Sequence, residues 1–350
     1  MRFVTVPGTA VEWLESLSPW PVDGFGTDRM RALLDRLENP QRSFEAIHVV
    51  GTKGKSTAAR RIARTIGGPA YTSPHVSGWH ERLDTDPDGF ARAVERIRAD
   101  AEAVAATQFE AVTAAAFADF AARGATVAAI EAGLGGRHDA TNTIEARVVL
   151  LTNVGLEHTD VLGSTREEIA AEKLAVAGPG SIVILPDDEF ARLVPGEVRI
   201  GGAEEAVEAF LGERRPLAAA SLPGRLEIRE NEVRDGAHTP DAVDWLLERL
   251  PEPHDYVVVA SILGDKDAAG ILDRLARAGR TFVATASSNP RALTPEAVAD
   301  LARSRFRDVH AEPEPGAALA LAHQLGGRVL VTGSLYLLAD LAGGDRKSVR

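Results

Sequence analysis

The chain has 350 residues, a formal net charge of −12 and no cysteine. The length suits two domains of ordinary size. The absence of cysteine excludes disulfides and thiolate chemistry, and the acidic balance argues against a nucleic-acid partner, which needs a basic face. No apolar run is long enough to span a membrane. Residues 1–20 lack a basic segment followed by an apolar one, so we expect a cytoplasmic protein without a signal peptide.

Short apolar runs alternate with amphipathic stretches along the chain, a pattern typical of βαβ units and a mostly parallel sheet. Strands are predicted at 47–50, 126–131, 147–153 and 181–185. Helices are predicted at 56–66, at 108–123 and at 165–177, where Thr165 to Glu168 form a capping box. The pattern weakens over 187–222 and resumes with strands at 256–262, 281–286 and 328–332.

We therefore predict an α/β fold with two domains. A P-loop-type, doubly wound, parallel-sheet ATPase domain is expected over residues 1–222. A smaller Rossmann-like α/β domain is expected over residues 223–350.

The strongest single motif is HVVGTKGKST, residues 48–57, between a predicted strand and a predicted helix. Backbone N–H groups of such a turn and the helix N-terminus can hold phosphates, a lysine can reach the β/γ-phosphates, and a hydroxyl can hold Mg²⁺. The usual first glycine is replaced by Val49, so this is a variant loop, and the simpler interpretation is a turn that only caps a helix. The predicted ATP-binding residues here are Gly51, Thr52, Gly54, Lys55, Ser56 and Thr57.

Two further stretches place polar side chains after predicted strands, where doubly wound sheets bind ligands. Glu131 opens the glycine-rich stretch EAGLGGRHDATN, and a carboxylate beside a phosphate is a common Mg²⁺ ligand. His158 lies in LEHTD, residues 156–160. Taken alone, each residue would more often have a structural role.

Lysine is rare in this chain. The 39 basic residues include 34 arginines, and the five lysines are Lys53, Lys55, Lys173, Lys266 and Lys347. Four of the five lie in motifs: Lys53 and Lys55 in HVVGTKGKST, Lys173 at the end of LTNVGLEHTDVLGSTREEIAAEK (residues 151–173), and Lys266 in GDKD (residues 264–267). This suggests chemistry that a guanidinium cannot provide.

These motifs, with TSPH at 72–75, LPGRLE at 222–227, DGAHTP at 235–240, GDKD at 264–267 and VTGSLYL at 331–337, occur in one order over nearly the whole chain. In that order the chain resembles the folylpolyglutamate synthase/dihydrofolate synthase branch of the Mur ligase superfamily. The resemblance implies an ATP- and Mg²⁺-dependent ligase that joins L-glutamate to dihydropteroate or a reduced folate through an acyl phosphate. From the net charge and the lengths of the apolar runs we expect no nucleic-acid or membrane partner, and we expect a monomer.

The resemblance also implies roles for the first domain. Ser56 would hold one Mg²⁺, and Glu131 with His158 would hold a second. Lys55 would act in catalysis, and Lys173 matches a lysine that is carbamylated in this superfamily. Ser73 and His75 match the loop beside the folate site.

In the second domain, Arg225 is expected at the ATP phosphates and Asp235 at the ribose. His238, expected to act in catalysis as well as binding, and Ser334 are expected at the incoming glutamate.

The chain departs from the family pattern in three places. Lys55 is followed directly by Ser56 and Thr57, where the family loop commonly reads Gly-Lys-Gly-Ser. Thr239 stands where the family usually has asparagine, and no Gly-x-His-Gln…Asn segment occurs between Pro186 and Pro223.

Two alternatives stay open. One is another Mur-type amino-acid ligase, although peptidoglycan ligases carry a UDP-binding domain before the P-loop and only 50 residues precede Gly51 here. The other is a non-catalytic homologue, against which the intact motif residues argue.

Overall fold

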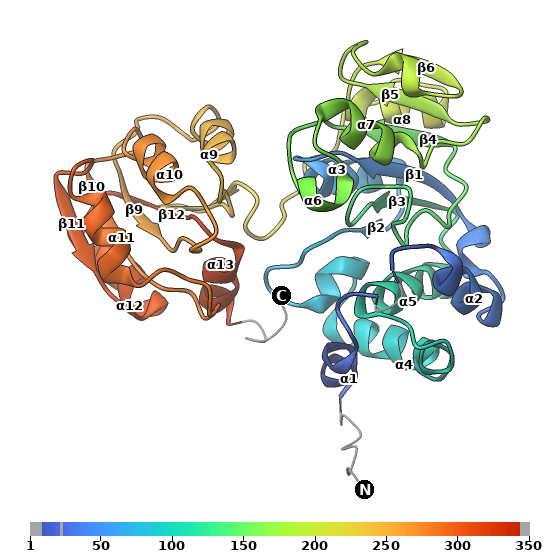
Figure 1. The fold of residues 1–350 in the computed structure, drawn as a ribbon, viewed down its shortest axis with the longest axis horizontal. Coiled ribbons are helices and arrows are strands. Elements are labelled where there is room, and N and C mark those ends of the chain that lie inside the picture. The colour runs from blue at the N-terminus through green and yellow to red at the C-terminus, as the bar shows by residue number, and fades with distance from the viewer. Residues whose placement is uncertain (1–8, 22–23, 344–350) are drawn as a thin grey trace, which may run out of the picture. The chain divides into compact units, whose positions relative to one another are not determined.

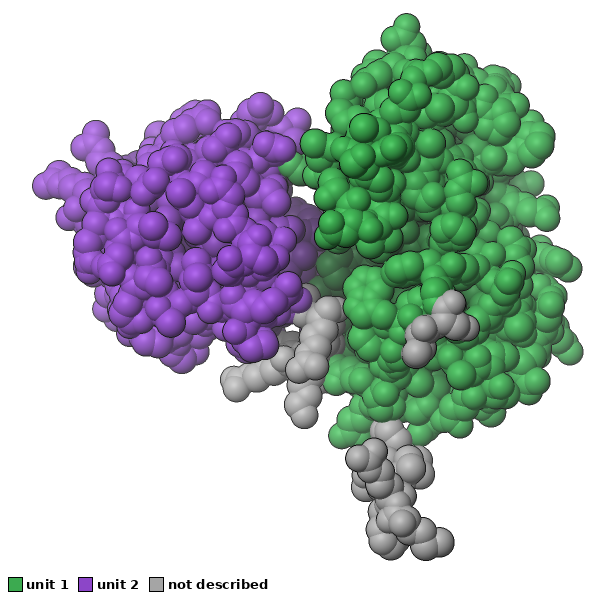
Figure 2. Space-filling view, in the orientation of Figure 1, with its two compact units in different colours: residues 1–75, 79–220, 350 green, residues 76–78, 221–349 purple. Residues whose placement is uncertain are grey.

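The computed structural model describes residues 9–21 and 24–343. Lys347 and the first eight residues of the segment considered for a signal peptide lie outside the described residues. The described residues up to 75 and those at 79–220 form one compact unit, and residues 76–78 with those from 221 onward form a second (Figure 2). Each unit has its own six-stranded sheet.

The sheet of unit 1 is entirely parallel, with strand order β2-β3-β1-β4-β5-β6. Its central strand, β1, pairs with β3 on one side and β4 on the other. The strands are β1 (Glu45–Val50), β2 (Ala70–Tyr71), β3 (Val127–Glu131), β4 (Val148–Leu151), β5 (Ile182–Leu185) and β6 (Glu197–Ile200). The chain thus leaves β1 at the point where the strand order reverses, which is where doubly wound sheets bind ligands.

Helices cover both faces of this sheet (Figure 1). Successive side chains of a strand point to opposite faces, so β1 contributes apolar side chains to the core on each side. Ile47 and Val49 pack with helices α3 and α8, whereas Ala46 and Val50 pack with α4, α5 and α7. The helices of unit 1 are α1 (Ala10–Ser16), α2 (Asp28–Arg36), α3 (Lys55–Ile66), α4 (Pro87–Ala103), α5 (Gln108–Ala122), α6 (Thr159–Leu162), α7 (Arg166–Leu174) and α8 (Ala203–Leu211).

Unit 2 is a second α/β layer structure, with strand order β11-β10-β9-β12-β8-β7 and only β7 antiparallel. Its strands are β7 (Glu227–Ile228), β8 (Glu232–Arg234), β9 (Tyr256–Ala260), β10 (Thr281–Ala284), β11 (Asp308–Ala311) and β12 (Arg328–Thr332). Helices α9 (Pro240–Leu247), α10 (Ala268–Leu275) and α11 (Pro295–Ala302) pack on one face, and α12 (Pro315–Leu325) and α13 (Leu335–Ala342) on the other. The predicted pair of α/β folds is confirmed.

The predicted strands and helices before residue 187 all form, and the capping box of Thr165 and Glu168 begins α7. The expectation of a weak pattern over 187–222 was wrong in part, since this segment contains β6 and α8. Strand β6 is an edge strand with mostly exposed side chains, so it lacks the buried alternation that reveals a strand. Among the described residues, no helix is long and apolar enough to cross a membrane.

Candidate active site

The turn after β1 has a backbone that only glycine can adopt at its first position. Gly51 has φ of 141°, and a Cβ there would lie 2.0 Å from Oγ1 of Thr152. The turn ends at Gly54, the left-handed N-cap of α3, which has no side-chain cap. The first N–H groups of α3 are thus left without a side-chain acceptor, and together with the helix dipole they favour an anion such as a phosphate.

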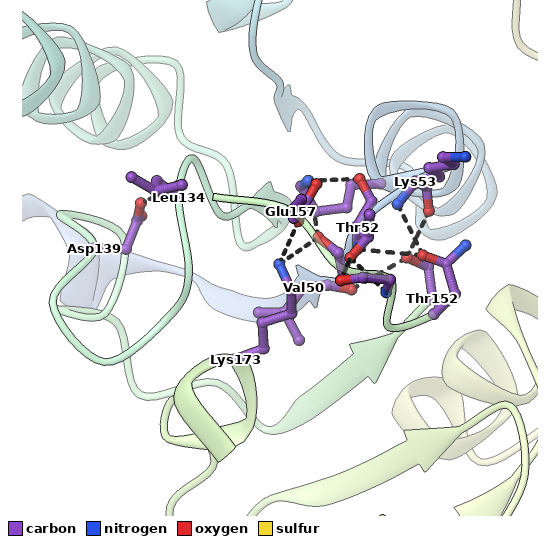
Figure 3. Close-up of polar contacts among 12 residues, drawn as sticks. Val50, Thr52, Lys53, Leu134, Asp139, Thr152, Glu157 and Lys173 are labelled. Carbon is purple, nitrogen blue, oxygen red and sulfur yellow. Dashed lines mark hydrogen bonds and ion pairs between the residues drawn. The ribbon is translucent and has the colours of Figure 1, made fainter. Parts of the chain in front are cut away.

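The segment after β4 supports this turn through the side chains of Thr152 and Asn153 and the backbone amide of Gly155. Asn153 accepts from the Lys53 amide at 2.8 Å, and the Thr152 hydroxyl donates to the Lys53 carbonyl at 2.7 Å. The Gly155 amide donates to Oγ1 of Thr52 at 3.0 Å. Figure 3 shows these contacts around Thr52, Lys53 and Thr152. Sequence reasoning missed Asn153, although its place at the end of a predicted strand was a usable signal.

Two lysine ammonium groups meet at one carbonyl of the turn. Nζ of Lys55 lies 2.9 Å from the Gly51 oxygen, and Nζ of Lys173, reaching from α7, lies 3.0 Å from the same atom. Lys173 also pairs with Glu157 at 2.8 Å (Figure 3). Lys173 is only 1% exposed. Burial lowers the pKa of its amine, the nearby Lys55 lowers it further, and Glu157 opposes both effects.

The Ser56 hydroxyl, at the start of α3, and the Glu131 carboxylate, at the end of β3, lie together beside the turn. The Ser56 hydroxyl donates to Oε1 of Glu131 at 2.9 Å, and the Ser73 amide donates to Oε2 at 2.8 Å. Glu131 is only 2% exposed. A hydroxyl and a carboxylate placed together beside a phosphate loop are the hard oxygen donors that a divalent cation such as Mg²⁺ prefers. The residues present fit such an ion.

His158 lies in a different setting from Glu131. It is exposed, has φ of 46° and precedes α6 without capping it by its side chain. Glu131 and His158 follow strands that are not neighbours, because β3 and β4 lie on opposite sides of β1. Within residues 9–21 and 24–343, no cluster of three His, Asp or Glu side chains is arranged to hold a metal. A shared metal site for Glu131 and His158 stays a prediction.

His75 is buried and neutral. Nε of Arg82 donates to its Nδ1 at 2.9 Å, and its ring centroid lies 4.6 Å from that of Trp79. Burial, followed by the charge of Arg82, lowers the pKa of His75 to about 2. Because a guanidinium only donates, Nδ1 of His75 is an acceptor and the proton sits on Nε2.

The glycine-rich stretch after Glu131 forms a closed loop. The buried carboxylate of Asp139 accepts from the Leu134 amide at 2.8 Å and from the Thr141 amide at 3.0 Å. Gly136 packs against the carbonyl of Lys173, where a Cβ would approach to 2.5 Å. The loop is thereby packed against α7, the helix that carries Lys173.

Four residues of unit 2 with predicted binding roles lie near the ends of β8 and β12, since these strands pair in parallel. They are Arg225, Asp235, His238 and Ser334. Both oxygens of Asp235 accept backbone amides, from Leu226 at 2.7 Å and Ala237 at 2.8 Å. Burial raises the pKa of Asp235, while these two bonds and the charge of Arg225 oppose the rise. Asp235 thus joins the turn after Leu222 to the loop after β8.

The glutamate candidates lie on the same edge of this sheet. Nδ1 of His238 lies 2.8 Å from the Gly236 carbonyl, and Ser334 caps α13 by accepting from the Tyr336 amide at 3.1 Å. The Gly333 amide donates to the Ala237 carbonyl at 2.9 Å, which holds the two segments together. Ser334 is buried and His238 is half-buried. Ligand contacts for Arg225, Asp235, His238 and Ser334 remain predictions.

Comparison with known proteins places both units in one superfamily. Residues 49–200 match the Mur ligase middle domain, and residues 224–335 match the Mur ligase glutamate ligase domain. A dihydrofolate synthase/folylpolyglutamate synthase of Mycobacterium tuberculosis is 31% identical, over 79% of this chain and 77% of the relative. A folylpolyglutamate synthase of Lacticaseibacillus casei is 30% identical, over 88% of this chain and 92% of the relative.

A solved structure agrees with these relatives. The Mycobacterium tuberculosis folylpolyglutamate synthase, complexed with ADP and AMPPCP, has a TM-score of 0.81 and 28% identity, and covers 91% of this chain and 96% of its own. The alignment to the mycobacterial relative runs over 377 positions but covers only 79% of this chain, so the relative carries segments that this chain lacks. The chain belongs to the dihydrofolate synthase/folylpolyglutamate synthase family of ATP-dependent ligases.

Proposed function

We propose that this chain uses ATP and Mg²⁺ to join L-glutamate to dihydropteroate, to a reduced folate, or to both. Residues 1–222 would bind ATP and residues 223–350 would bind glutamate. The observation that carries the proposal is the convergence of Lys55, Lys173, Ser56 and Glu131 around the turn after β1. A turn of this kind holds phosphates, and its lysine and oxygen donors are the groups that phosphoryl transfer requires.

The first step would move the γ-phosphoryl group of ATP to the acceptor carboxylate and form an acyl phosphate. In the structure Lys55 donates to the Gly51 carbonyl, and we propose that a phosphate oxygen replaces this acceptor when the nucleotide binds. The backbone amides at the start of α3 would hold the β-phosphate. The ammonium of Lys55 would then neutralise charge that spreads over the transferring oxygens.

A divalent ion, when bound, would supply further charge neutralisation at the phosphates. Ser56 and Glu131 would hold it, because their oxygens already lie together. His158 is proposed as a further ligand on the strength of the family resemblance. A bifunctional folylpolyglutamate synthase/dihydrofolate synthase of Yersinia pestis, solved with AMPPNP and a manganese ion, shares this fold at a TM-score of 0.81.

The second step would be attack of the glutamate amine on the acyl phosphate, with release of phosphate. We propose that His238 and Ser334 hold the glutamate at the ends of β8 and β12, with Arg225 at the phosphates and Asp235 at the ribose. Asp235 already uses both oxygens in the loop, so any ribose contact would share them. Ser73 and His75 would line the folate side of the first domain.

The buried amine of Lys173 supports its proposed carbamylation. Only an uncharged amine reacts with CO₂, and burial lowers the pKa of Lys173 towards that state. The product would be an anion next to the phosphate loop. Glu157, which now accepts from Lys173, would have to turn towards solvent, and its side chain is already 25% exposed.

The test is an assay of glutamate-dependent ADP release with purified protein, ATP and Mg²⁺, offering dihydropteroate or tetrahydrofolate in separate reactions. ADP release that requires both glutamate and one pterin supports the proposal and identifies the acceptor. Release with glutamate and neither pterin would indicate another amino-acid ligase. No release in any reaction, from protein that still binds ATP, would indicate a non-catalytic homologue.

A further inference from the structure

A buried histidine on the central strand belongs to no step described so far. His48 is fully buried in β1, three residues before Gly51. Its Nε2 lies 2.9 Å from Oγ1 of Thr141, whose hydroxyl in turn donates to Asp139. On β1 it lies in register with Ile130, the residue before Glu131.

The two hydrogen bonds that join His48, Thr141 and Asp139 run in one direction. The Asp139 carboxylate accepts the backbone amides of Leu134 and Thr141, so the Thr141 hydroxyl proton also points to it. The Thr141 oxygen is then left to accept, and Nε2 of His48 must be the donor. Nδ1 of His48 has no hydrogen-bond partner within the described structure and therefore carries a lone pair.

The neutral ring is also what burial favours. Desolvation lowers the pKa of His48 to about 3, so the imidazole is uncharged at physiological pH. An imidazolium here would place a second, unpaired N–H in the core, which is costlier than an unused lone pair.

We propose that His48, through Thr141 and Asp139, is a positioning residue that holds the glycine-rich loop, and with it Glu131, at the phosphate loop. These hydrogen bonds connect β1 to both ends of the loop, because Asp139 also accepts the backbone amides of Leu134 and Thr141. The same loop packs on α7 through Gly136. This inference rests on the proposed role of Glu131 as a ligand of the divalent ion.

The test replaces the donor and measures the metal requirement. His48→Leu removes the Nε2 donor, whereas His48→Gln keeps an N–H group near the same position. Loss of residues that orient metal ligands typically costs about 10- to 100-fold in metal affinity. We expect His48→Leu to raise the Mn²⁺ concentration for half-saturation about 10-fold, measured in the presence of ADP by electron paramagnetic resonance of free Mn²⁺. His48→Gln should recover most of this loss.

A matched control separates positioning from general loss of stability. Ser181→Ala removes another buried hydrogen bond of unit 1, from Oγ to the Ala146 carbonyl at 2.7 Å. It should lower the melting temperature without changing Mn²⁺ binding. If His48→Leu behaves in the same way, or if Gln does not recover binding, His48 has only a structural role.

Two further measurements make the outcome unambiguous. Nitrogen-15 shifts of the His48 ring should show a protonated Nε2 and a bare Nδ1, and the opposite tautomer would overturn the direction of the chain. Glu131→Gln is measured in parallel. If it leaves Mn²⁺ binding unchanged, the ligand assignment fails. If it weakens binding while His48→Leu does not, only the positioning inference fails.

Discussion

Replacing Lys173 by methionine separates its contribution to stability from its contribution to chemistry. The structure predicts little loss of stability, because no buried polar group is left without a partner. The Gly51 carbonyl keeps the Lys55 ammonium at 2.9 Å, and Glu157, with 25% of its side chain exposed, can be hydrated. The substitution also removes a buried cation. We expect the free energy of unfolding to change by no more than about 1 kcal/mol, or about 2–4 °C in melting temperature for a domain of this size.

The pH dependence of this difference has a definite sign. Burial lowers the pKa of Lys173 in the folded state below the ordinary 10.5 of the unfolded chain. Below the folded pKa both states bind the proton, and the folded state carries the full cost of burying it. As pH rises between the two pKa values, only the unfolded state keeps the proton, so the wild type gains stability relative to Lys173→Met. Urea unfolding of both proteins, from neutral pH towards 10.5, measures this gain.

Activity should respond very differently. If the carbamate is required, Lys173→Met should lose at least about 10²-fold in glutamate-dependent ADP release. Lys173→Arg should be equally inactive, and Lys173→Ala should regain activity with a short-chain carboxylate. Full activity of the methionine variant would refute the chemical role. A loss of stability above about 3 kcal/mol would refute the argument that Gly51 and Glu157 keep their partners.

Three other substitutions test the remaining roles. Lys55→Ala should lower ADP release by about 10²–10³-fold with an unchanged melting temperature, and near wild-type release would mean that the loop does not hold ATP as proposed. Glu131→Gln should raise the metal concentration needed for half-maximal activity, and an unchanged requirement would remove it from the ligand set. Ser334→Ala should raise the glutamate KM far more than the ATP KM, besides losing about 1 kcal/mol as a helix cap. Thr294→Ala, which removes the cap of α11 in the same unit, is its matched control and should leave both KM values unchanged.

Much of the fold could be predicted because its determinants are local. The β1 strand, the Gly51 turn and α3 follow one another within a few residues, and each has a clear sequence pattern. Strand β6 escaped detection because an exposed edge strand needs no apolar alternation. The positions of the catalytic candidates followed from strand ends and from family resemblance.

The contacts of these residues could not be predicted, because they join distant parts of the chain. Asn153 reaches the Lys53 amide across 100 positions, and Lys173 reaches the Gly51 carbonyl across 122. A lysine within a helix is ordinarily a surface residue, and only the folded chain shows that Lys173 is buried. Glu157 was overlooked for the same reason, since its partner lies on another element.

The N-terminus of α3, which has no side-chain cap, has a consequence for the exchange of amide hydrogens with solvent. Gly54 offers no side-chain acceptor, whereas α5 and α7 begin with threonine caps that accept an amide of the first turn. In the absence of a nucleotide, the amides of the first turn of α3 have no acceptor within the helix and should exchange rapidly. A bound phosphate would act as the missing cap, so nucleotide should slow exchange at these amides while the capped first turns of α5 and α7 stay unchanged. The ligand would thereby complete a secondary-structure element that the chain itself leaves open.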